Sequence, residues 1–238
     1  MSKLLLIGGS NYLSQELIKT IPESYTVVAV SINEDTDRHR KFLKLEQKNL
    51  HKEILNITKG NLFWLDNLIK KYDYFDSMIY FPMSNSRKQF LNITNEDFQK
   101  AVDVNGKLPF LISQKLIPGM IGTGHGRFVF ISSIWSIKGN PKGSNEYAIT
   151  KVMLNQLSKQ ITASFIEKNI TSTTLIFGSV NLHLRNDNDA LLFTEKDRVI
   201  SHKEIAEFIF ILLDQSRRSF AGNTVLIDNG VLSTIGVH

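Results

Sequence analysis

Short apolar runs recur along the chain and alternate with longer segments of mixed polarity. Runs that are apolar at nearly every position predict parallel strands covered on both faces, here Lys3–Ile7, Tyr25–Ile32, Ile54–Thr58, Ser77–Phe81, Gly126–Ser133, Ile170–Phe177 and Thr224–Ile227. The longer segments predict helices over Tyr12–Thr20, Asn61–Tyr72, Thr94 to about Ile117, Glu146–Lys168 and Lys203–Leu213. This alternation predicts an α/β fold, a doubly wound parallel sheet of about seven strands with helices on both faces.

Composition narrows the class of protein. A chain of 238 residues with 42% hydrophobic content suits one globular domain over residues 1–238. The absence of cysteine excludes disulfides and thiolate metal sites and agrees with a cytoplasmic protein. The apolar run within the first ten residues, Leu4 to Ile7, is too short for a signal peptide or a membrane span, so we expect no membrane partner.

The net charge of +5 does not demand nucleic acid as a partner. The most basic run, Arg38 to Lys41, lacks the aromatic interleaving of a base-stacking surface. We read it as a solvated helix face. The histidines show no helical pair at metal-ligand spacing, so we expect no metal site.

Candidate chemistry lies between Ser133 and Lys151. Tyr147 and Lys151 are four residues apart on one predicted helix and share a face. An ammonium beside a phenol is expected to lower the tyrosine pKa, so that the phenol exchanges protons near neutral pH. Ser133, at the end of the preceding strand, could hold the same substrate oxygen by a hydrogen bond.

These residues, with Asn105 in the preceding helix and Gly8-Gly9 after the first strand, resemble the short-chain dehydrogenase/reductase family over nearly the whole chain. The resemblance implies a Rossmann-like dinucleotide-binding domain and an NAD(P)(H)-dependent oxidoreductase. It makes Tyr147 the general acid, Lys151 the partner that lowers its pKa and holds the nicotinamide ribose, and Ser133 the group that polarises the carbonyl. Asn105 would support proton resupply through its backbone carbonyl, which Pro109, four residues later, leaves without an N–H donor.

The cofactor motifs match less well than the catalytic ones. Only the first glycine of the family's turn is kept, as Gly8, while Tyr12 and Ser14 replace the other two, and bulky residues up to Pro82 replace the small turn after the fourth strand. The end of the second strand carries no acid at the NAD-type position, and Arg38 and Arg40 follow, which favours NADP(H) over NAD(H). The resemblance places cofactor contacts at Gly8, Ser10, Asn11, Tyr12, Leu13, Ser31, Asn33, Asn56, Ile57, Phe81, Pro82, Tyr147, Lys151, Gly178 and Val180.

Two functions stay open. The first is reduction of a ketone to an alcohol, the substrate being a small molecule or a 3-oxoacyl thioester on an acidic carrier protein. Similar proteins include 3-oxoacyl-carrier-protein reductases, which dock an acidic carrier on basic residues near the site entrance. Lys168 matches one such position, while the second falls on Gly124, in a turn that also offers His125 and Arg127. The second is a non-enzymatic binding or partner subunit, favoured by the altered cofactor motifs.

The catalytic helix predicts an assembly. Its apolar residues Val152, Met153, Leu154, Leu157, Ile161 and Phe165 exceed what one stripe of about 100° would hold. Leu111, Ile112, Leu116 and Ile117 do the same on the Asn105 helix. A two-fold copy is the simplest cover for the surplus, so we expect a homodimer or homotetramer.

Overall fold

The computed structural model describes residues 1–32, 36–57, 61–140, 143–177, 200–214 and 218–228. Seven parallel strands form one sheet in the order β3-β2-β1-β4-β5-β6-β7. The strands are β1 (Ser2–Ile7), β2 (Tyr25–Ser31), β3 (Leu50–Ile54), β4 (Ser77–Tyr80), β5 (Gly126–Ile131), β6 (Ile170–Phe177) and β7 (Thr224–Ile227). The doubly wound parallel sheet expected from the apolar runs is therefore confirmed.

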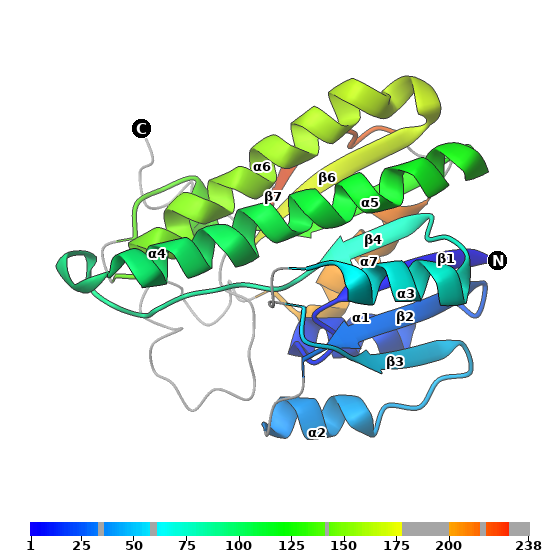
Figure 1. Ribbon diagram of the computed structural model, residues 1–238, viewed down its shortest axis with the longest axis horizontal. Coiled ribbons are helices and arrows are strands. Elements are labelled where there is room, and N and C mark those ends of the chain that lie inside the picture. Colours follow the sequence, from blue (N-terminus) through cyan, green and yellow to red (C-terminus); the bar gives the residue numbers. More distant parts are fainter. Residues whose placement is uncertain (33–35, 58–60, 141–142, 178–199, 215–217, 229–238) are drawn as a thin grey trace.

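Helices cover both faces of the sheet (Figure 1). The α-helices are α1 (Tyr12–Thr20), α2 (Asp37–Leu43), α3 (Phe63–Tyr72), α4 (Asn95–Val102), α5 (Leu108–Thr123), α6 (Asn145–Phe165) and α7 (His202–Leu213). A π-helical segment, η2 (Asp103–Lys107), joins α4 to α5, and short 3₁₀ segments are η1 (Phe90–Asn92), η3 (Ile134–Ser136) and η4 (Ile166–Lys168).

Successive side chains along each strand point to opposite faces of the sheet, and this creates two hydrophobic cores. In β1, Leu4 and Leu6 face α1 and α7, while Leu5 and Ile7 face α3, α5 and α6. All four side chains are fully buried, as expected for a strand in the middle of a parallel sheet. Because every strand runs the same way, the carboxyl ends meet at one edge, where ligands bind in open α/β sheets.

Two predicted elements were wrong in position. We expected the third strand at Ile54–Thr58, but β3 ends at Ile54, and Thr58 lies outside the described residues. As an edge strand paired only with β2, β3 has three polar residues, His51, Lys52 and Glu53, between Leu50 and Ile54 and lacks the continuous apolar run of a central strand.

The helix expected to end near Ile117 instead continues through Pro118 to Thr123. Met120 beyond the proline is fully buried, and Gly124 closes the helix with φ 78°. Tertiary burial and a glycine cap thus carry the helix past the residue that the sequence pattern took as its end.

The basic run on α2 is only partly a solvated face. Arg40 and Lys41 are exposed, but His39 is 3% exposed. Its Nδ1 lies 3.4 Å from the hydroxyl of Ser31, at the end of β2. Phe42 on the same helix is fully buried against Gly9. The prediction of a wholly solvated run was therefore wrong at His39, because α2 packs one side against the β1–α1 turn.

Candidate active site

Three of the predicted catalytic side chains meet at the carboxyl edge of the sheet. Ser133 follows β5 and caps η3, and its hydroxyl hydrogen-bonds to the phenol of Tyr147 in the first turns of α6. Lys151 lies one turn further along α6, with its Nζ 5.7 Å from the centre of the Tyr147 ring. Parallel strand β5 and helix α6 therefore bring together a hydroxyl, a phenol and an amine, as the sequence predicted.

The pKa values depart from the sequence-based expectation. Burial raises the pKa of Tyr147 above its ordinary value, and the hydrogen bond from Ser133 offsets only part of that rise. Burial also lowers the pKa of Lys151 to about 7, because its amine is 1% exposed. The expected lowering of the Tyr147 pKa by Lys151 was therefore wrong in direction for this structure: desolvation of the phenol outweighs the influence of a lysine that burial has itself made easier to deprotonate.

This arrangement has a defined chemical use. A phenol with a raised pKa stays protonated at neutral pH and can donate a proton to an oxygen that gains negative charge. Lys151 donates hydrogen bonds to two backbone oxygens, that of Ile131 at 2.7 Å and that of Pro82 at 3.5 Å. An amine with a pKa near 7 can both give and take a proton close to the phenol.

Asn105 lies in the π-helical segment η2 and is fully buried. Its side chain accepts from the Ser84 N–H at 2.9 Å and donates to the Ser84 carbonyl at 3.0 Å. It also donates to Thr150 Oγ1 at 2.8 Å, next to Lys151 on α6. The amide thus ties the segment after β4 to the catalytic helix, a role that sequence reasoning missed because it assigned Asn105 only a backbone function.

The π register changes the effect of Pro109. In a π-helix each N–H bonds five residues back, as the Leu108 N–H does to the Asp103 carbonyl. By that spacing Pro109 leaves the carbonyl of Val104 without its donor, and the phenol of Tyr80 donates to that oxygen at 2.6 Å. The open carbonyl of Asn105 that we expected from an α-helical register stays a prediction.

Residues 82–88 form what we call the clamped segment, which is held at every second residue. The contacts join Lys151 Nζ to the Pro82 carbonyl, Asn105 to both backbone groups of Ser84, Glu146 Oε1 to the Ser86 N–H, and the Ser144 N–H to the Lys88 carbonyl. The intervening residues Met83, Asn85 and Arg87 are exposed. The segment therefore runs along the start of α6 as one wall beside the catalytic group.

Glu146 is the unexpected member of this set. Its carboxylate is 1% exposed, and Oε1 accepts from the Ser86 N–H at 2.6 Å. Sequence reasoning missed it because a glutamate in the first turn of a helix usually faces solvent and favours the helix dipole. Nothing in the local sequence around Glu146 indicates a buried contact with a residue 60 positions away.

The turn between β1 and α1 is held by the conformation of Gly8 and by side-chain hydrogen bonds. Gly8 has φ +94°, and a Cβ there would lie 3.0 Å from the Cβ of Phe81, so a side chain would be strained and crowded. Ser14, in place of a glycine, is fully buried and its hydroxyl donates to the Gly8 carbonyl at 2.9 Å. Asn11 caps α1 by accepting from the Leu13 N–H at 2.9 Å. The substituted residues thus preserve the turn by new hydrogen bonds.

These observations fit a dinucleotide at this edge. The first helix begins beside the carboxyl end of β1, where backbone N–H groups and the helix dipole favour phosphate. Tyr12 is only partly buried, and Ser10 is buried. An incoming phosphate would compete with the Asn11 side chain for the Leu13 N–H.

The other predicted cofactor contacts are spread between surface and core. Asn56 is exposed, while Ile57 and Phe81 are buried, Ile57 among the α3-side core residues and Phe81 in the α1-side core. Ser31 is also buried, and its hydroxyl donates to the Ile32 carbonyl at 3.2 Å. Three further predicted contacts, Asn33, Gly178 and Val180, lie outside the described residues.

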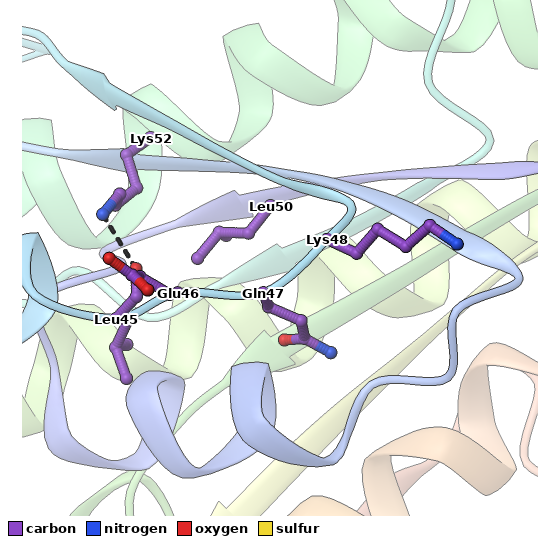
Figure 2. Close-up of a pocket in the computed structure, with 6 residues that line it drawn as sticks. All are labelled: Leu45, Glu46, Gln47, Lys48, Leu50 and Lys52. Carbon is purple, nitrogen blue, oxygen red and sulfur yellow. Dashed lines mark hydrogen bonds between the residues drawn. The ribbon is translucent and has the colours of Figure 1, made fainter.

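A surface depression beside β3 lies apart from the predicted catalytic residues. An open depression before and along β3 is lined by Leu45, Glu46, Gln47, Lys48, Leu50 and Lys52 (Figure 2). Lys52 already donates to the carbonyls of Leu43 and Leu45, and no predicted catalytic residue lines the depression. Within the described ranges no cluster of histidine and acidic side chains could hold a metal ion, and no helix is long and apolar enough to cross a membrane.

The predicted carrier-docking residues are not all available. Arg127 is 1% exposed and donates to the carbonyls of Gly126 and Asn169, so it is not available on the surface for docking. His125 lies with Nε2 3.6 Å from the buried carboxylate of Asp76. Lys168 is exposed, but it lies 21 residues beyond Tyr147, or about 30 Å along the helix axis.

Comparison with known proteins places this arrangement in a family. A family model described as "Enoyl-(Acyl carrier protein) reductase" matches residues 26–232. The 3-oxoacyl-[acyl-carrier-protein] reductase FabG of Rickettsia felis is 22% identical over 237 residues, covering 96% of this chain and 95% of the relative. FabG of Rickettsia conorii is 25% identical over 175 residues, covering 70% and 71%.

Solved structures share the fold. A 4-hydroxyisoleucine dehydrogenase complexed with NADH has a TM-score of 0.83 at 20% identity, covering 98% of this chain and 99% of that one. ElxO with NADP bound has a TM-score of 0.82 at 21% identity, covering 98% of this chain and 99% of that one. With the family model matching most of the chain and the serine, tyrosine and lysine gathered at the carboxyl edge of a doubly wound sheet, the chain belongs to the short-chain dehydrogenase/reductase family.

Proposed function

We propose that this protein is an NAD(P)H-dependent oxidoreductase that reduces a ketone to an alcohol. The observation that carries the proposal is the joint placement of Ser133, Tyr147 and Lys151 at the sheet edge where dinucleotides bind in this architecture. Family membership and relatives named as reductases support it. When bound, the nicotinamide supplies the hydride to the carbonyl carbon.

The protein's own residues then complete the reduction. Tyr147, kept protonated by burial, donates its proton to the substrate oxygen as negative charge develops there. The Ser133 hydroxyl holds that oxygen by a hydrogen bond and fixes the carbonyl beside the phenol. Lys151, whose pKa of about 7 lets it exchange a proton at neutral pH, stands next to the phenol and would also hold the nicotinamide ribose.

The β1–α1 turn would hold the pyrophosphate through the backbone at the start of α1. We favour NADP(H) over NAD(H), because Arg38 and Arg40 follow β2 and neither Ser31 nor Ile32 at its end is acidic, although Glu34 and Asp35 follow closely in the sequence. The proposal predicts tighter binding of NADPH than of NADH, measured as a blue shift or enhancement of nicotinamide fluorescence on titration.

The activity test uses Tyr147→Phe, which removes the acidic hydroxyl and keeps the ring. We expect turnover of a panel of ketones, including a small 3-oxoacyl thioester, to fall at least 100-fold, the usual contribution of a general acid. Cofactor binding and thermal stability should stay close to wild type. Tyr72→Phe, on the far side of α3, is the matched control, and undiminished turnover in the Tyr147 variant would refute the assignment.

The structure bears on a carrier-bound substrate. Tyr147 lies at the start of α6 and Lys168 ends η4, beyond the other end of that helix, so one chain cannot place this lysine beside the catalytic group. A docking role for Lys168 would need the site of a second copy. Lys168→Glu should then raise KM for a carrier-bound thioester and leave KM for the small analogue unchanged. Equal effects on both substrates would count against docking.

The competing function is a non-enzymatic partner subunit with a decayed cofactor site. The altered glycine turn motivates it, but Asn11 and Ser14 each make a side-chain hydrogen bond that holds that turn. Failure of both NADPH and NADH to bind at millimolar concentration would favour the partner subunit over the enzyme.

We also propose a homodimer or homotetramer. Several apolar side chains on α5 and α6 are exposed in the single chain: Phe110, Ile121, Ile149, Val152 and Met153. Leu154 and Ile161 on α6 face the sheet and are buried, so the exposed set is the surplus that a second copy would cover. Light scattering after size exclusion tests this, and a 27.1 kDa monomer at micromolar concentration would contradict it.

A further inference from the structure

Tyr80 is a fully buried tyrosine that the proposed reaction does not use. It ends β4, and its ring packs in the core beneath α3, α5 and α6. Its hydroxyl donates to the Val104 carbonyl at 2.6 Å, inside the π-helical segment that carries Asn105. A buried tyrosine of a strand thus donates a hydrogen bond to a carbonyl of a helix.

The reason lies in the hydrogen bonds of η2. The Leu108 N–H, which in an α-helix would bond to Val104, bonds to Asp103 instead. The next donor in the π register would be residue 109, a proline with no N–H. Val104 would therefore keep a buried carbonyl without a partner inside the helix, which is costly, and the Tyr80 phenol fills that role.

We propose that Tyr80 is a positioning residue that maintains the π turn and thereby sets the direction of the Asn105 side chain. The proposal rests on the proposed reductase function for its activity readout. Each residue of an α-helix turns the chain by about 100°. A return to α-helical spacing would rotate Asn105 about the helix axis by a large part of that angle. Its contacts with Ser84 and Thr150 would then be lost, and with them the link between the clamped segment and α6.

Two other features keep the same turn in place. Gly106, next to Asn105, packs so closely on α6 that a Cβ would lie 2.5 Å from the Met153 sulfur. Burial raises the pKa of Tyr80 far above its ordinary value, so the phenol remains a donor at every pH at which the protein folds. The hydrogen bond to Val104 is therefore permanent rather than pH-dependent.

A double-mutant cycle separates this role from simple packing. Tyr80→Phe keeps the ring and removes the donor. Pro109→Ala adds an N–H five residues after Val104, which can donate to the orphaned carbonyl in the π register. We expect Tyr80→Phe to lower kcat about tenfold, because the displaced Asn105 would no longer hold Ser84 and the catalytic helix in place, with little change in KM for the cofactor. Pro109→Ala alone should retain at least half of wild-type kcat, and the double variant should recover most of the loss.

Crystal structures of the variants give a readout that does not depend on catalysis. In Tyr80→Phe we expect the Leu108 N–H to bond to the Val104 carbonyl in place of that of Asp103, and Asn105 to lose its contacts with Ser84 and Thr150. The double variant and the control Tyr72→Phe should keep the π register. Wild-type kcat together with an unchanged π register in Tyr80→Phe would overturn the proposal. A double variant that is as slow, or as unfolded, as the single one would also overturn it. If wild type reduces no carbonyl compound, the proposed function fails, and the register at Leu108 still decides the role of Tyr80.

Discussion

Replacing Lys151 by methionine should change how the stability of the protein depends on pH. Lys151 is 1% exposed, and burial lowers its pKa from 10.5 to about 7. Between these two values the unfolded chain binds a proton that the folded chain has released. Stability therefore rises with pH across this window in the wild type, and the cost of protonating the buried amine is greatest below pH 7.

The magnitude follows from the two pKa values. A pKa shift of one unit corresponds to about 1.4 kcal/mol, so the full cost below pH 7 is of order 5 kcal/mol. Most of that cost is still present at pH 6 and less than half of it at pH 9. The free energy of unfolding of the wild type should therefore gain about 2.5 kcal/mol relative to Lys151→Met between pH 6 and pH 9.

Urea denaturation at half-unit pH intervals measures this difference directly. Lys159→Met is the matched control, because Lys159 lies on the same helix and is exposed, so its curve should run parallel to that of the wild type. A constant difference between wild type and Lys151→Met across the pH range would refute the reasoning. It would mean that the Lys151 amine is in contact with solvent or with an acidic side chain, neither of which the structure places beside it.

The remaining predictions concern how the clamped segment is held. Gly143 has φ +97°, and a Cβ there would lie 2.5 Å from the Lys88 carbonyl, so Gly143→Ala should cost roughly 2–4 kcal/mol in urea denaturation. Gly139→Ala, where a Cβ meets nothing within 4 Å, should change stability by less than about 0.5 kcal/mol, and equal effects would contradict the clash. Glu146→Gln keeps an oxygen for the Ser86 N–H and should retain stability within about 0.5 kcal/mol, whereas Glu146→Ala should lose at least about 1 kcal/mol and lower turnover. Equal losses in the two Glu146 variants would show that the charge, rather than the hydrogen bond, matters.

Several elements could be predicted closely because their signals are local. The helix Tyr12–Thr20 and the strands Ile170–Phe177 and Thr224–Ile227 have the bounds that the apolar pattern predicted. An apolar run marks a strand, and turn residues mark where it ends. Both β3 and β7 lie at an edge of the sheet, but β7 keeps an apolar run, whereas β3 has three polar residues between Leu50 and Ile54 and was therefore misplaced.

In the candidate site, too, local features could be predicted from the sequence and long-range contacts could not. The spacing of Tyr147 and Lys151 is a property of one helix, so their shared face could be predicted. The direction of the Tyr147 pKa could not, because it depends on how much of the chain covers the phenol. The contacts of Asn105 with Ser84 and of Glu146 with Ser86 join residues 21 and 60 positions apart, and no local pattern reports them.

The clamped segment has a consequence for how this protein can change over generations. Its even-numbered positions are bound through backbone groups, and its odd-numbered side chains, Met83, Asn85 and Arg87, face outward. The path of the chain therefore depends little on the side chain at Met83. Asn85 is more constrained, because its side chain accepts a hydrogen bond from the Arg87 N–H at 2.8 Å, and Arg87 has φ 59°, which disfavours β-branched replacements. Mutation that respects these two limits can alter size and charge on this outer side of the segment while Tyr147 keeps its surroundings. Selection can thus redirect what the protein binds without having to rebuild how it reacts.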